Sequence, residues 1–259
     1  MNIVVLLAGI ADPKWPLPPV ALDPAAMRKN SHLILSPFDE AALEIALQIR
    51  ETLPGTSLTI GVTGGAESDA LLRKAAAYRP NRAVRIETHA LHPWDAREQA
   101  EHLSALLPEL DEAADLLLVG REFGDYDAGA LPPGLAAALG WGFFGLTQYV
   151  RRDGDKLLLL REQASLEETH MLSAPLVASV TNDRRNRLRH PLMKNVMEAK
   201  RMNIDVLRPT APQSQHLSLD DIVPAPPPLR AGTGRILSGA LDAQIADLAD
   251  FLAAWRTEL

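Results

Sequence analysis

The sequence predicts an α/β fold: a parallel sheet covered by helices on both faces, followed by an antiparallel extension and a C-terminal arm. Over the first 140 residues, short runs of Val, Ile and Leu alternate with longer helical patterns. Continuously apolar strands that alternate with helices are typical of parallel sheets buried on both faces. After Trp141 the strand-like runs follow one another directly, which predicts the antiparallel part.

The elements of the parallel part are expected in a regular order. Pro37 suits the first turn of a long helix, and Asp39 and Glu40 favour the positive end of its dipole. Strands are expected at Asn2–Ala8, Ser57–Thr63, Arg82–Glu87 and Asp115–Gly120, and helices at 37–53, 66–78 and 93–107.

Four strand-like runs are expected beyond Trp141. Two of them, within residues 146–163, are joined by Arg152–Asp155, whose Asp-Gly pair favours a hairpin turn. Two more follow at Leu166–Leu172 and Leu176–Val180. We interpret all four as an antiparallel extension of the sheet.

The C-terminal part predicts an arm on a linker. We expect a folded domain over residues 1–208, a proline-rich linker over 209–236 with six prolines between Pro209 and Pro228, and an amphipathic helix over 237–259. A helix with a full apolar stripe needs a surface to lie on, which is either its own core or a partner. The stripe comprises Leu237, Leu241, Ile245, Leu248, Leu252 and Trp255.

Composition excludes several classes of function. The chain has no cysteine, which rules out disulfides, thiolate metal sites and a cysteine nucleophile. Its first residues lack the basic region of a signal peptide, and no apolar run reaches the ~18 residues of a membrane span. We therefore expect a cytoplasmic protein without direct membrane insertion.

A concentrated positive segment contrasts with the acidic whole. The formal charge is −7, yet Arg184 to Arg201 contains seven Lys or Arg and one acid, Glu198. Such a segment either steers an acidic partner or is an ordinary solvated face. Nucleic-acid binding is a third interpretation, but the net charge and the lack of interleaved aromatic residues argue against it.

A ligand of a parallel sheet is expected at the carboxyl ends of its strands. Four loops leave such ends: Gly9–Asp12, His32–Phe38, Thr63–Ala66 and Gly120–Leu131. Exposed amides of the last loop can hold a phosphate or ribose, or the loop is only a capped turn. No Walker motif, GxGxxG or GxSxG is present.

Three neighbouring residues are of types that bind metal ions. His89, His92 and Asp95 stand at three-residue spacing, but Pro93 breaks a common helical face. Asp95 is better interpreted as an acid near a helix start, so no metal is expected.

Three motifs in order resemble the beta subunit of electron-transfer flavoproteins over residues 2 to 209. Ser36-Pro37-Phe38-Asp39-Glu40 is similar to the family's Asn-Pro-Phe-Asp-Glu, and the loop from Gly120 is similar to its Gly-Lys-Gln-Ala-Ile-Asp-Asp-Asp. Asn182, Arg184, Asn186 and Arg189 match its Asp-Leu-Arg-Leu-Asn-Glu-Pro-Arg, and Asn195 to Lys200 match its Asn-Ile-Met-Lys-Ala-Lys.

The resemblance implies a Rossmann-like, adenine-nucleotide-binding fold and an electron carrier subunit, not an enzyme. In the family, beta pairs with an alpha subunit, and the two hold one FAD that carries electrons from a dehydrogenase to a membrane quinone oxidoreductase. Beta also holds a structural AMP or, in bifurcating members, a second FAD. By position the nucleotide-binding residues are Leu6, Ser36, Pro37, Phe38, Asp39, Thr63, Gly120, Arg121, Asp125, Asp127, Gly129, Ala130 and Leu131.

The resemblance also implies two partner surfaces. The segment after Arg189 corresponds to the loop that grips the dehydrogenase, with Met193 at the gripping leucine. Arg184, Arg189 and Lys194 are expected to bind the same partner. The C-terminal helix is expected to lie on the alpha subunit through Leu241, Leu248 and Trp255.

One departure leaves AMP open. Where the family has Asn-Gln-Thr-Gly, this chain has Gly129-Ala130-Leu131-Pro132, which removes side-chain partners of the phosphate and one amide. A stand-alone adenine-nucleotide-binding enzyme or sensor on the same fold is the alternative function, although no constellation for phosphoryl or adenylyl transfer can be named.

Overall fold

The chain forms two units, each described by itself. The computed structural model describes residues 1–15, 32–88, 91–208, 216–218, 220, 234 and 236–257. The first unit is Met1–Ile222 and the second is Val223–Leu259. The predicted linker at 209–236 lies almost entirely outside the described residues, as do the last two residues of the predicted arm.

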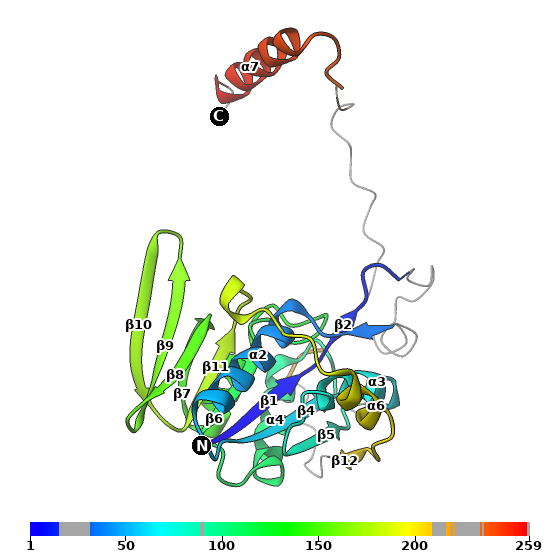
Figure 1. Cartoon of the computed structure of the whole chain (residues 1–259), viewed down its shortest axis with the longest axis vertical. Helices are drawn as coiled ribbons and strands as arrows, with labels where there is room; N and C mark the ends of the chain where they lie inside the picture. Colours follow the sequence, from blue (N-terminus) through cyan, green and yellow to red (C-terminus); the bar gives the residue numbers. More distant parts are fainter. Residues whose placement is uncertain are drawn as a thin grey trace. The chain divides into compact units, whose positions relative to one another are not determined.

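A seven-stranded parallel sheet forms the centre of the first unit (Figure 1). Its spatial order is β12 (Asp205–Leu207), β5 (Arg82–Ile86), β4 (Ser57–Thr63), β1 (Asn2–Leu7), β6 (Leu116–Gly120), β11 (Leu176–Val180) and β7 (Gly142–Thr147). The chain runs outward from β1 through β4 to β5 and then returns to β6 on the other side of β1. The strand order therefore reverses between β1 and β6, the usual place of a ligand crevice.

Helices cover both faces of this sheet. Ile3, Val5 and Leu7 of β1 pack toward α2 (Pro37–Thr52) and α3 (Asp69–Ala76). Val4 and Leu6, which alternate with them, pack toward α4 (Ala96–Leu110) and α5 (Leu131–Leu139). Two apolar layers on a doubly covered sheet confirm the predicted α/β, Rossmann-like class.

Local side chains decide where α4 begins. The Asp95 carboxylate accepts a hydrogen bond from the Glu98 amide at 3.0 Å, so the helix starts at Ala96 and Pro93 lies before it. The helix then continues to Leu110, three residues past the predicted end, and tolerates Pro108 in its last turn. The interpretation of Asp95 as an acid at a helix start is confirmed.

The antiparallel part forms a sheet of its own. β8 (Tyr149–Asp153), β9 (Lys156–Gln163) and β10 (Leu166–Ser173) pair in antiparallel order, and the turn between β8 and β9 has Gly154 at a φ of 63°. The fourth predicted strand, β11, instead joins the parallel sheet between β6 and β7. Every residue of β11 is buried, as is typical of a strand covered on both faces.

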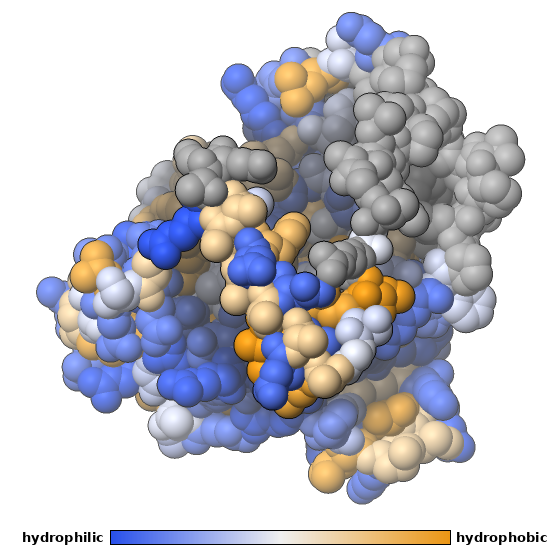
Figure 2. All heavy atoms as spheres, turned by 90° about the horizontal axis from the view of Figure 1, so that it is seen from above, coloured by the Kyte–Doolittle hydropathy of each residue, from blue (hydrophilic) through white to orange (hydrophobic). Residues whose placement is uncertain are grey.

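The second unit contains one described helix, α7 (Leu241–Thr257). Its large apolar side chains are exposed within the described residues: Leu241, Ile245, Leu248, Phe251, Leu252 and Trp255. Figure 2, seen from the α7 end of Figure 1, shows apolar spheres along this helix. None of the helices in the described part is both long enough and apolar enough to cross a bilayer.

Candidate functional site

The predicted nucleotide-binding residues meet at one edge of the sheet. Leu6 lies in β1, Thr63 ends β4 and Gly120 ends β6. Because β1 pairs with both β4 and β6, the carboxyl ends of the three strands are neighbours. Leu6 is buried in the core behind this edge.

The start of α2 is held against the end of β1 by one carboxylate. Asp39 is fully buried and accepts hydrogen bonds from the amides of Ser36 and Gly9, each at 3.0 Å, and from Ala8 at 3.5 Å. The Asp39 amide in turn donates to the Ser36 hydroxyl at 3.0 Å, and Pro37 occupies the first turn. Burial raises the pKa of Asp39 although these hydrogen bonds oppose the shift.

A second carboxylate organises the loop after β6. Asp127 Oδ1 accepts hydrogen bonds from the amides of Gly129 at 3.1 Å, Ala130 at 2.7 Å and Leu131 at 3.2 Å. Its Oδ2 accepts from the Phe123 amide at 3.2 Å. These are the amides that sequence reasoning assigned to a phosphate, and here they donate to the chain's own side chain.

Asp125 and Phe38 also hold neighbouring segments together at this edge. The Asp125 carboxylate accepts from the Ala11 amide at 3.0 Å, which ties the β6 loop to the segment after β1. A Cβ added to Gly120 would lie 2.9 Å from the Cβ of Phe38, so only glycine fits there. The Arg121 guanidinium lies 5.0 Å from the centre of the Phe38 ring.

The described residues at this edge do not fit the phosphate of AMP. The cavity there has a volume of about 60 Å³ and is lined by Ala8, Thr63, Thr88, Leu91, Pro93, Gln99, Phe123, Gly124, Asp125 and Tyr126. Pockets for drug-sized ligands have volumes of about 300–1,000 Å³. The one acidic lining residue, Asp125, would repel a phosphate placed beside it, and the amides of Gly129, Ala130 and Leu131 already donate to Asp127.

A second candidate site surrounds α6 (Met193–Lys200). Leu192 and Met193 at its first turn are 70% and 74% exposed, and Met197 one turn later is also exposed. Apolar side chains this exposed have the character of a protein-binding surface. We refer to Leu192, Met193 and Met197 as the apolar knob.

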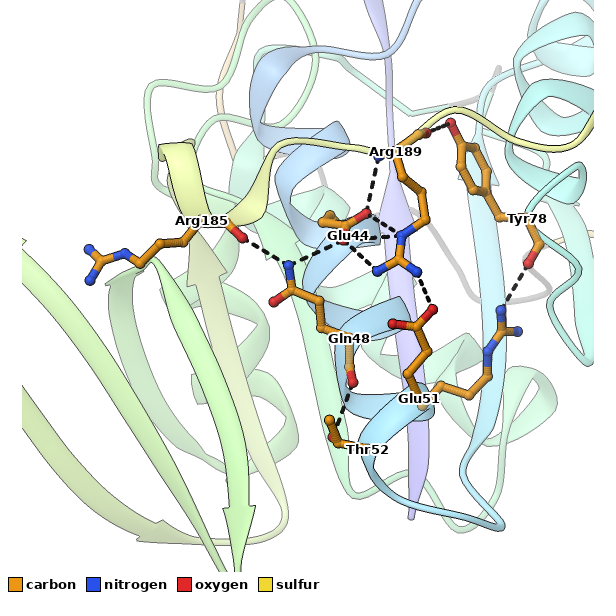
Figure 3. A network of polar contacts seen from close by, with 8 residues as sticks. Glu44, Gln48, Glu51, Thr52, Tyr78, Arg185 and Arg189 are labelled. Carbon is orange, nitrogen blue, oxygen red and sulfur yellow. Dashed lines mark hydrogen bonds and ion pairs between the residues drawn. The ribbon is translucent and has the colours of Figure 1, made fainter.

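A polar network fastens the chain just before the knob to α2 and α3 (Figure 3). The buried Glu44 carboxylate accepts from the Arg189 amide at 3.2 Å and from Arg189 Nη2 at 2.6 Å, and Arg189 Nη1 pairs with Glu51. The Tyr78 hydroxyl donates to the Arg189 carbonyl at 2.8 Å, and Gln48 Nε2 donates to the Arg185 carbonyl at 2.8 Å. These contacts fix both the side chain and the backbone of the segment.

The network shifts two pKa values. Hydrogen bonds from Arg189 to Glu44 and Glu51 raise the pKa of the Arg189 guanidinium. Burial, with the nearby negative charges of Glu40 and Glu44, raises the pKa of Tyr78 to about 12. We call residues 190–200 the docking segment, and Glu44, Gln48, Tyr78 and Arg189 the docking-segment clamp.

The clamp reduces the positive charge available to a partner. Of the seven cations counted in the sequence, Arg189 is paired with Glu44 and Glu51. Arg185 is paired with Asp183 at 2.8 Å and Glu162 at 2.6 Å. The exposed cations are Arg184, Arg187, Lys194, Lys200 and Arg201, of which Lys194 lies 3.8 Å from Glu198.

Sequence reasoning missed Glu44 and Tyr78. Glu44 was visible as an acid inside the apolar run AALEIAL, and it is 4% exposed. A buried acid implies a partner, but only the fold reveals that this partner is Arg189, 145 residues further along the chain.

The metal alternative finds no support in the described part of the chain. No group of three ligand-type side chains capable of holding a metal ion occurs there, and His89 is outside the described residues. His92 instead binds the buried Glu98, with its Nδ1 3.0 Å from the carboxylate.

Comparisons with known proteins agree on one family. The model of the family "Electron transfer flavoprotein domain" matches residues 26–212. Electron transfer flavoprotein subunit beta of Mycobacterium tuberculosis is 29% identical over 210 residues, covering 80% of this chain and 78% of that protein. The human subunit beta is 31% identical, and the probable subunit beta of Schizosaccharomyces pombe is 33% identical. Both cover 180 residues, 68% of each chain.

Proposed function

The chain belongs to the electron transfer flavoprotein family, and from this membership we propose that it is a beta subunit that carries electrons in complex with an alpha subunit. The observation that carries the proposal is the match over residues 26–212. The complex would hold FAD, which supplies the electron-accepting ring system, and would pass electrons from a dehydrogenase to an acceptor such as a membrane quinone oxidoreductase. The proposed compartment is the cytoplasm, and the chain acts as a carrier, without a substrate of its own.

The exposed face of α7 supports the alpha subunit as a partner. Leu241, Leu248 and Trp255 are 70%, 47% and 56% exposed, and they recur on one side of the helix. Burying one large apolar side chain is worth about 1.5–3 kcal/mol, so a stripe of this size strongly favours association. We propose that α7 is the arm that holds the alpha subunit.

The knob and its cations support a dehydrogenase as the second partner. Met193 is unbranched and polarizable, which suits insertion into a partner's pocket. Arg184 and Lys194, which stand nine residues before and one residue after Met193 in the sequence, are exposed and would raise the encounter rate with an acidic partner. In this proposal Arg189 holds the segment through the clamp, because its charge is already paired with Glu44 and Glu51.

The proposal does not include AMP. The amides of Gly129, Ala130 and Leu131 donate to Asp127, and the side chains at these three positions provide no hydroxyl or amide. We propose that the nucleotide edge of this subunit is instead completed by its own carboxylates, as a structural element.

The donor role is tested with Met193→Ala in the complex with the alpha subunit. The expected result is a higher KM for the dehydrogenase with unchanged FAD content, since truncation removes contact area at the interface only. Lys156→Ala, at the exposed start of β9, is the control and should match the wild type. Loss of FAD from the Met193 variant would contradict a docking role, and equal KM values would contradict the assignment of the knob.

A further inference from the structure

A surface pocket lies between α3 and α6, away from the nucleotide edge. Its volume is about 290 Å³, just under the lower end of the range for drug-sized ligands. The lining residues are Ala70, Arg73, Lys74, Ala77, Pro191, Val196 and Lys200. Ala70, Arg73, Lys74 and Ala77 have not been assigned to a cofactor or to a partner, whereas Pro191, Val196 and Lys200 belong to the segment after Arg189.

The pocket combines apolar walls with cationic groups. Ala70 of α3, Ala77 just after α3, and Pro191 and Val196 of the docking segment contribute its apolar walls. The remaining lining residues are Arg73, Lys74 and Lys200, and no acidic side chain lines the pocket. Its chemistry is therefore that of a site for an apolar group that carries or adjoins a negative charge.

One donor in the pocket is left without a partner in the described part of the chain. Arg73 Nε is buried and makes no hydrogen bond there. A buried N–H without an acceptor costs about 1–3 kcal/mol, but Nε has almost no accessible surface, so a carboxylate in the pocket would meet the rest of the Arg73 guanidinium. Lys200 makes no ion pair with another described residue, whereas Lys74 lies 3.8 Å from Glu40.

The pocket is continuous with the apolar knob. Met193, Val196 and Lys200 stand at positions i, i+3 and i+7 of α6, which places them along one stripe of the helix. Met193 therefore projects one turn before the wall that Val196 forms. A surface in contact with the knob reaches the pocket without crossing another element.

We propose that this pocket receives an aliphatic or aromatic side chain of the electron-donating dehydrogenase, next to an Asp or Glu whose carboxylate binds Arg73 and Lys200. The proposal rests on the proposed function, because it deepens the contact of the knob with that partner. The partner's pocket takes Met193, and this pocket takes a side chain in return. Such reciprocal anchors are typical of protein interfaces, where a few buried side chains carry most of the binding energy.

The test uses the full chain, labelled with ¹⁵N, in complex with the alpha subunit. The probe is the peptide acetyl-Glu-Leu-Phe-Glu-amide, titrated while amide shifts are followed by NMR. We expect the amide chemical shifts of Ala70, Ala77 and Val196 to change with peptide concentration until they saturate. Acetyl-Lys-Leu-Phe-Lys-amide lacks the negative charge, and acetyl-Glu-Ser-Ser-Glu-amide lacks the apolar group. Each should bind at least about tenfold more weakly.

Three variants locate the binding. Arg73→Gln and Lys200→Gln should each weaken the acidic apolar peptide by about tenfold, which is the loss of about 1.4 kcal/mol. Lys156→Gln removes one exposed charge at the start of β9, outside the pocket and the knob, and should change affinity less than about twofold. An equal loss of peptide affinity in all three variants would indicate general charge attraction and would contradict the pocket proposal.

The outcome is separable from the proposed function. If the complex forms with FAD bound but the peptide shifts fall outside α3 and α6, the pocket proposal is wrong and the carrier role stands. If no FAD complex forms, the carrier role fails, and the titration of the chain alone still decides whether the pocket binds an acidic apolar segment.

Discussion

Single carboxylates satisfy the backbone amides at the nucleotide edge. Asp39 satisfies amides at the end of β1, Asp125 satisfies Ala11, and Asp127 satisfies the start of α5. Each of these donors would otherwise be an orphan group at a strand or helix end. The edge is therefore stable without a bound anion, which explains how the chain tolerates Gly129, Ala130 and Leu131 where the family has polar side chains.

Replacing Asp127 by Ala should lower the free energy of unfolding by about 2 kcal/mol, because four amides lose their acceptor. Urea unfolding followed by circular dichroism measures this loss. Asp155→Ala, in the exposed β8–β9 turn, is the matched control and should stay within about 0.5 kcal/mol of the wild type. Equal stabilities of the two variants would show that Asp127 does not organise the loop.

Tyr78 reports on the clamp through its titration. Its pKa is raised from 10.0 to about 12, so the folded state binds the phenolic proton more tightly than the unfolded state. The stability from this group is complete below about pH 10 and is lost as the pH rises toward 12. Absorbance at 295 nm should show one late tyrosine, which Tyr78→Phe removes. A late transition that persists in this variant would assign it to another tyrosine.

The docking segment is ordered by α2 and α3 as much as by its own helix. α6 has eight residues, which is too short for an isolated helix to be stable in water. The clamp supplies what the local sequence lacks, since it fixes the chain at Arg185 and Arg189.

Glu44→Gln should increase amide hydrogen exchange in Met193–Lys200 by at least about tenfold, because the Arg189 guanidinium keeps only its exposed ion pair with Glu51. Exchange in α4 should not change. Glu51→Gln is the comparison, since the Glu51 side chain is 59% exposed and its pair is worth less. If both variants exchange alike, the buried pair does not hold the segment.

The apolar face of α7 predicts a contact with the alpha subunit that can be removed without unfolding the first unit. Leu248→Asp puts a charge in the apolar stripe and should abolish the complex with the alpha subunit, while the melting of the first unit stays unchanged. Ala246→Asp introduces the same charge outside the stripe and should leave the complex intact. Size-exclusion chromatography with light scattering distinguishes them, and loss of the complex in both variants would argue against the stripe.

Periodicity made the elements predictable, and long-range pairing made the rest unpredictable. Apolar strands and amphipathic helices have fixed periods, so the strands β1, β4, β5 and β6 and the helix α2 follow from the sequence. The place of β11 does not, because which strand it pairs with is decided by contacts distant in sequence. The roles of Arg189 and Asp127 were hidden in the same way, since a charge count cannot show which side chains are already paired.

At the scale of the whole molecule, exposed positive charge is concentrated in one region although the net charge is negative. The chain carries −7 overall, yet Arg184, Lys194, Lys200 and Arg201 remain exposed around the apolar knob. A local positive field on an acidic protein orients encounters without promoting general attraction to nucleic acid. The family match, the face of α7 and this field agree with a subunit that works between two protein partners.

The most direct test of the beta-subunit role is native mass spectrometry of the chain purified with an alpha subunit, followed by release of small molecules. We predict a yellow 1:1 complex that contains one FAD and releases no AMP, and a colourless chain when it is purified alone. AMP in the released fraction would contradict the closed nucleotide edge. A chain that stays alone and binds no flavin in the presence of the alpha subunit would contradict the carrier role itself.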